Sequence, residues 1–104
     1  MRRDDRQALT YRLTEAAEFD LIHVYIEGVR EFGVRQADIY HDLLEQAFQR
    51  IAHNPEITRE RKEIKPPVRV LPCGSHMIIY ETDADGVLIL RIRHHKEDWV
   101  ENPL

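Results

Sequence analysis

Residues 74–94, GSHMIIYETDADGVLILRIRH, carry the strongest structural pattern in this chain. Two apolar runs, residues 76–82 and 87–94, flank the polar turn Asp83-Ala84-Asp85-Gly86. Apolar residues that alternate on both sides of a short turn ending in glycine predict a β-hairpin.

The second strand of this hairpin has two faces of different character. Strict alternation of side chains separates an apolar face from a face that mixes aliphatic side chains with arginines. The apolar face would contain Leu88, Leu90, Ile92 and His94. The mixed face would contain Val87, Ile89, Arg91 and Arg93. We expect the first face to pack on helices and the second to be exposed, as a binding surface often is.

The first half of the chain predicts a strand over residues 8–13 and two helices. Thr14 is a suitable N-cap for the first helix, Gly33 separates the two helices, and Asn54-Pro55 ends the second, which spans about residues 34–53. A connection this short implies an antiparallel helical hairpin. A polar loop over 54–67 and a strand over 68–71 follow. The order β-α-α-β-β-β predicts an α+β fold, with a three-stranded antiparallel sheet after the helices.

Composition indicates one globular domain, assigned to residues 8–104, with residues 1–7 as a flexible tail. Cys73 is the single cysteine, which excludes an internal disulfide. No apolar segment has the length of a membrane span, and the first residues do not resemble a signal peptide, so we expect a cytoplasmic protein that does not bind membranes. The net charge of −4 argues against sequence-independent binding of nucleic acid.

The sequence predicts no cofactor and no metal site, because it has neither a glycine-rich phosphate loop nor paired cysteines, and its histidines are scattered. One catalytic alternative stays open. Glu63 could act as a general base and His94 or His95 as an acid in a nuclease. Spacing alone favours the simpler interpretation, in which these residues are ordinary surface charges.

Two predictions concern aromatic side chains. Tyr25, Phe32, Tyr40 and Phe48 recur at helical spacing and are expected to pack within the helical hairpin. Trp99 follows the last strand and either packs back on the domain or anchors a partner, and we favour the first.

At this point the sequence resembles toxins of the RelE/ParE superfamily, and within it the ParE branch of bacterial type II toxin–antitoxin modules. The resemblance extends over about 80 residues in several short motifs. They are Ala17 with Asp20-Leu21-Ile22 and Tyr25; Phe32-Gly33 with Gln36-Ala37 and Tyr40; Leu44, Phe48, Ile51-Ala52 and Pro55; Val68-Arg69; Gly74-Ser75-His76 with Ile78 and Tyr80; and Ile89-Leu90-Arg91-Ile92 with His94.

The resemblance implies a growth-arresting toxin that poisons DNA gyrase. A ParD-like antitoxin would neutralise it in a hetero-oligomer, and nucleic acid would be contacted only indirectly, through that antitoxin. The residues expected to bind the antitoxin are Arg59, Arg69, Val87, Ile89, Arg91 and Arg93, because a cluster of unpaired guanidinium groups beside aliphatic side chains suits an acidic peptide segment. The alternative is a RelE-type ribosome-dependent mRNA endonuclease that uses Glu63, His94 and His95. Residues 77–80 lack the basic side chain of those nucleases, so the protein is expected to bind its target rather than to act as an enzyme.

Overall fold

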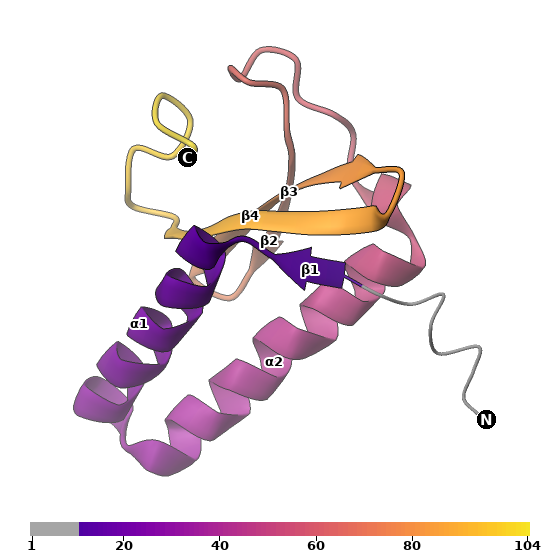
Figure 1. Ribbon diagram of the computed structural model, residues 1–104. Helices are drawn as coiled ribbons and strands as arrows, with labels where there is room; N and C mark the ends of the chain where they lie inside the picture. Colours follow the sequence, from indigo (N-terminus) through magenta and orange to yellow (C-terminus); the bar gives the residue numbers. More distant parts are fainter. Residues whose placement is uncertain (1–10) are drawn as a thin grey trace, which may run out of the picture.

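A computed structural model describes residues 11–104, which have an α+β fold. The elements, in chain order, are β1 (Tyr11–Leu13), α1 (Glu15–Phe32), α2 (Val34–His53), the short 3-10 helix η2 (Pro55–Ile57), β2 (Arg69–Cys73), β3 (His76–Asp83) and β4 (Gly86–His94) (Figure 1). The predicted β-α-α-β-β-β order and α+β class are confirmed. The tail assigned to residues 1–7, and the first part of the strand expected over 8–13, lie outside the described residues.

Capping and turn residues set the boundaries of the two helices. The side chain of Thr14 accepts a hydrogen bond of 3.0 Å from the backbone N–H of Ala17, which caps α1. Gly33, at φ 88°, joins the helices in a conformation that side chains disfavour. Asn54 then ends α2, and the following Pro55 cannot continue it.

The four strands form a mixed sheet in the order β1-β4-β3-β2. The antiparallel pairs β2–β3 and β3–β4 match the prediction. β1 lies parallel to β4, so that Tyr11 is opposite Val87 and Leu13 is opposite Ile89. The helical hairpin is the crossover that allows this parallel pairing. The sheet therefore gains a fourth strand from the beginning of the domain.

A β-bulge in β4 overturns the predicted division of its faces. Ile79 pairs with Arg91 and Tyr80 pairs with Ile89, so Leu90 is an extra residue without a partner. Before the bulge the alternation is therefore reversed. Val87 and Ile89 are 1% and 0% exposed and belong to the core beside the helices, so the prediction that they form an exposed docking face is wrong.

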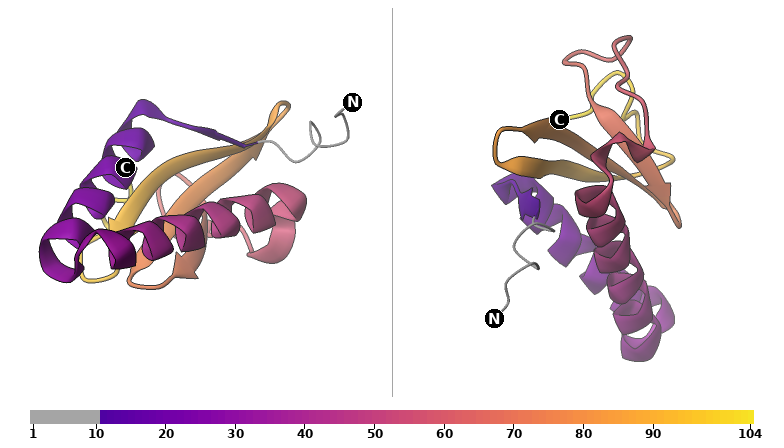
Figure 2. Two further views of the ribbon diagram at one scale, coloured as in Figure 1. Left: turned by 90° about the horizontal axis from the view of Figure 1, so that it is seen from below. Right: turned by 90° about the vertical axis from the view of Figure 1, so that its right-hand side faces the viewer.

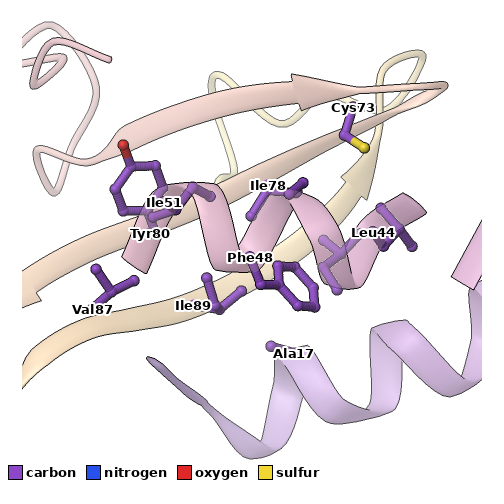
Figure 3. Close-up of a cluster of buried hydrophobic side chains, with 11 residues drawn as sticks. Ala17, Leu44, Phe48, Ile51, Cys73, Ile78, Tyr80, Val87 and Ile89 are labelled. Carbon is purple, nitrogen blue, oxygen red and sulfur yellow. The ribbon is translucent and has the colours of Figure 1, made fainter. Parts of the chain in front are cut away.

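The main core lies between the sheet and the helical hairpin (Figure 3). α2 contributes Leu44, Phe48 and Ile51, and Ala17 of α1 packs against the same cluster. The phenol ring of Tyr80 is fully buried there, and its hydroxyl donates to the carbonyl of Pro55 at 2.7 Å. This core holds the helical hairpin against the sheet.

The other face of the sheet is also covered. The loop after η2 and the segment after β4 lie over it, on the side opposite the helices (Figure 1; Figure 2 gives two further views). Leu88 and Leu90, which were expected to face the helices, belong to this second cluster, together with Ile64, Val68, Val70, Met77, Ile79 and Trp99. Trp99 is 8% exposed and has the guanidinium of Arg61 5.6 Å from its ring, which confirms that it packs on its own domain.

Candidate functional site

A groove of about 760 Å³ opens between the helical hairpin and one end of the sheet. Its walls come from α1 and α2, and its floor from the β2–β3 turn and the last residues of β4. It forms because the hairpin extends beyond the edge of the sheet, so that its outer half has no strand to pack on (Figure 1). This groove, with its wide opening and mostly apolar walls, is the main candidate site.

A hydrogen-bonded cluster forms the floor. The Tyr40 hydroxyl accepts from the N–H of Ser75 at 3.0 Å and lies 2.6 Å from Nδ1 of His76. Gly74, at φ 57°, permits this approach, because a Cβ there would lie 2.6 Å from the Tyr40 ring. The ring of His94 meets His76 edge to face at 5.3 Å and stacks on His95 at 4.7 Å. These contacts join α2 to the β2–β3 turn, to the start of β3 and to the end of β4.

Burial controls the protonation of this floor. Desolvation, helped by the neighbouring His94, lowers the pKa of His76 below its ordinary value. Desolvation also raises the pKa of the Tyr40 hydroxyl, which therefore remains protonated near neutral pH. Both groups are therefore neutral at pH 7.

The walls of the groove are largely apolar. Leu21 and Val24 of α1 face it, as do Ile39 and Leu43 of α2. Phe32 also lies at the groove and is 69% exposed, which contradicts the prediction that it packs inside the hairpin. Large apolar side chains exposed around one concavity typically indicate an interaction surface.

The charges around the groove are acidic. Its lining includes Asp20, Glu27, Glu31 and Glu97, and contains no lysine or arginine from the described part of the chain. The hairpin between residues 15 and 53 carries eight acidic and three basic side chains, a net charge of −5 with neutral histidines. The helical hairpin that forms the walls of the groove therefore has a net negative charge, although Asp20 and Glu97 pair with Arg91 and Arg93.

The two arginines predicted on β4 have partners within the domain. The Nε and Nη2 atoms of Arg91 donate to the carboxylate of Asp20 at 2.6 and 2.9 Å. Arg93 donates to Glu97 at 3.2 Å and to the carbonyl of Asn102 at 2.6 Å. These guanidinium groups stabilise the domain and are not the unpaired cluster that the sequence suggested.

The other two predicted arginines lie in the loop region. Arg59 is exposed and pairs with Glu63 at 3.1 Å. Arg69, on the edge strand β2, donates to the carbonyl of Thr58. The structure thus separates the six predicted antitoxin-binding residues: two are buried in the core, two pair near the end of β4, and two lie beside the loop after η2.

The alternative nuclease residues are not joined by hydrogen bonds. Glu63 bonds to Arg59, whereas His94 accepts from the N–H of Lys96 and stacks on His95. The Arg59 guanidinium lowers the pKa of Glu63, which weakens it as a general base. Within residues 11–104 no group of three or more histidine, cysteine or acidic side chains is placed to bind a metal ion. In the same residues, no helix is long and apolar enough to cross a bilayer.

The sequence patterns do not predict the groove. Tyr40 is predicted only to pack within the helical hairpin, and His76 belongs only to a family motif. Their contact depends on the β2–β3 turn folding against α2. One signal in the sequence could have indicated it. Ile39 and Leu43 are large apolar residues of α2 that lie outside the face packed on the sheet. Apolar residues on a second face of a helix indicate a second contact surface.

Comparisons with the sequences of known proteins all indicate the same family. A family model described as ParE toxin of type II toxin-antitoxin system, parDE, matches residues 11–99. The chain is 35% identical over 89 residues to Toxin ParE1 of Mycobacterium tuberculosis strain ATCC 25618 / H37Rv, covering 85% of this chain and 91% of that protein. It is 30% identical over 89 residues to Toxin ParE of Escherichia coli, covering 85% and 86%.

A solved structure has the same fold. It is titled as the chromosomal ParDE TA system from P. aeruginosa, and the TM-score is 0.73 at 19% sequence identity. The similarity covers 85% of this chain and 97% of that one. At this identity the comparison supports the fold, while the relationship depends on the sequence matches.

Proposed function

The chain belongs to the ParE toxin family of type II toxin–antitoxin systems, and from that premise we propose that it arrests growth by poisoning DNA gyrase and that a ParD-like antitoxin neutralises it. The toxin binds its target and performs no chemistry of its own. Its partner forms a hetero-oligomer with it and supplies any contact with nucleic acid. The observation that carries this proposal is the groove beside the helical hairpin, because its long and largely apolar walls suit a polypeptide segment.

The groove suits a peptide segment better than a small substrate. It extends along both helices and involves residues from Asp20 to Leu44. A helix or extended segment of a partner could bury Ile39, Leu43 and Phe32, which are exposed in the isolated chain. The antitoxin therefore binds here in our proposal, and Arg59 and Arg69 remain candidate contacts at a second point of the surface.

The chemistry of the site favours binding over catalysis. The buried imidazole of His76 has a lowered pKa, and the Tyr40 phenol has a raised pKa, so neither carries charge at neutral pH. Glu63, the general base of the alternative, has its carboxylate engaged by Arg59. A ribonuclease would need basic groups around its phosphate site, and the groove has an acidic lining.

A DNA-cleavage assay tests the proposal. Purified toxin incubated with gyrase and supercoiled plasmid should accumulate linear DNA after protein digestion, and antitoxin from the adjacent reading frame should abolish the effect. Absence of cleaved DNA at saturating toxin would count against gyrase as the target. New cuts in cellular mRNA, detected by primer extension and lost in Glu63→Gln or His94→Ala, would support the nuclease instead.

A further inference from the structure

We propose that the groove selects a partner segment with bulky apolar residues along one side and lysine or arginine along both flanks. This inference rests on the proposed function, because the antitoxin is the partner expected to occupy the groove. It reverses the expectation drawn from the sequence, in which unpaired arginines on β4 attract an acidic segment. The reversal follows from where the charges lie in the folded chain.

The arginines cannot attract an acidic segment to the groove. Arg91 is bound to Asp20 and Arg93 to Glu97, and neither arginine lines the groove. The guanidinium of Arg91 also donates to the carbonyl of Leu104 at 2.7 Å. An acidic partner would have to break these pairs before it could use either charge.

The most available charges at the groove are acidic. Glu31 has no hydrogen-bond partner among the described residues. Glu27 pairs with Arg30 at 3.3 Å, but both side chains are more than half exposed, so the pair is weak and a partner can displace it. Both glutamates line the groove near the tip of the hairpin. Since the whole hairpin carries a net charge of −5, its field adds to these two local charges. Cationic flanks on the partner complement this arrangement.

Two labelled peptides provide the test on the full chain. Both carry the same amphipathic stripe of leucine and phenylalanine, one flanked by lysines and the other by glutamates. Fluorescence anisotropy at low salt should give an affinity at least about tenfold higher for the lysine peptide, with the difference falling as salt is raised. Equal affinities, or tighter binding of the glutamate peptide, would overturn the proposal.

Matched variants locate the effect. Glu27→Gln with Glu31→Gln should remove most of the preference for lysine, whereas Glu15→Gln with Glu18→Gln, the same charge change on α1 away from the groove, should preserve it. Leu43→Ala should weaken both peptides, and Ile22→Ala, on the side of α1 outside the groove, should weaken neither. Equal loss of preference in the two charge variants would assign it to the general field and refute the site.

The outcomes also separate this inference from the proposed function. Gyrase poisoning that antitoxin reverses, combined with no peptide preference, refutes the basic-flank inference and leaves the toxin assignment intact. Lysine-selective binding by a chain that does not poison gyrase has the opposite meaning: the groove has the proposed chemistry, and the gyrase assignment is wrong.

Discussion

Asp20 on α1 and Arg91 on β4 form a two-pronged ion pair across 71 residues of sequence. The same carboxylate oxygen that accepts from Nε of Arg91 also accepts from the backbone N–H of Ile92 at 2.9 Å. Asp20 therefore attaches the first helix to the strand immediately after its bulge. The pair holds the hairpin against the end of the sheet where the groove opens.

Removing the charge of Asp20 should destabilise the domain. We expect Asp20→Asn to lower the free energy of unfolding by about 1–3 kcal/mol, because Arg91 and the Ile92 N–H lose a partly buried, charge-assisted acceptor. Urea unfolding followed by circular dichroism measures the loss. An exposed pair is the control: Arg12 and Asp83 are 43% and 39% exposed, so Asp83→Asn should cost much less than Asp20→Asn. Equal losses in the two variants would contradict a special role for Asp20.

The hydroxyl of Thr14 has two functions at the start of α1. It caps the helix through the N–H of Ala17 and donates to the carbonyl of Leu90 at 2.7 Å, at the bulge of β4. Thr14→Ala removes both bonds and should cost about 1–2 kcal/mol in thermal or urea unfolding. Thr14→Ser keeps the hydroxyl and should recover most of the stability. A serine variant as unstable as the alanine variant would show that the methyl group, not the hydroxyl, matters.

Two glycines allow backbone strain to be separated from crowding. Gly33 and Gly74 both have positive φ, so an alanine at either position should destabilise the domain by about 1–3 kcal/mol. Only at Gly74 would the new Cβ meet a neighbour, the ring of Tyr40. Gly74→Ala should therefore also shift the NMR signals of the Tyr40 and His76 rings, while Gly33→Ala leaves them in place. Unchanged ring signals in Gly74→Ala would exclude this contact.

Protonation of His76 should make stability depend on pH. Its pKa is lowered in the folded state, so below the ordinary histidine value of about 6.5 the unfolded chain takes up a proton that the folded chain resists. This contribution to stability is complete above that pH and is lost as the pH falls from about 6.5 toward the folded pKa. Urea midpoints measured between pH 7.5 and 5.5 should fall less in His76→Gln than in the parent chain. Equal falls in the two chains would contradict this role of His76.

Much of the fold was predictable because its signals are local. Thr14, Gly33 and Asn54-Pro55 mark helix boundaries through capping, positive φ and the missing proline N–H, and α2 was predicted to within a residue at each end. The hairpin of β3 and β4 followed from alternation and a glycine turn. The toxin family also followed from the sequence, because its motifs recur in order.

The candidate site was less predictable. Strict alternation placed Val87 and Ile89 on the outer face, and the bulge at Leu90 reversed them. The positions of Arg91 and Arg93 on β4 followed from the sequence, but their partners, Asp20 and Glu97, come from a helix and from the segment after the strand. The residue pattern of one strand contains no information about the side chains of other elements that contact it.

The amino-acid sequence by itself determined the helices and the hairpin strands, since hydrogen bonds and side-chain preferences within a few residues fix them. It also determined the family, because the family's motifs recur in order along the chain. Only the tertiary structure decided which face of β4 is buried, which carboxylates neutralise Arg91 and Arg93, and that Tyr40 meets His76 beside a groove. These features depend on register and on contacts between residues far apart in the chain. A bulge of one residue exchanges the two faces of a strand. A carboxylate from a distant part of the chain pairs with an arginine that would otherwise be available to a partner.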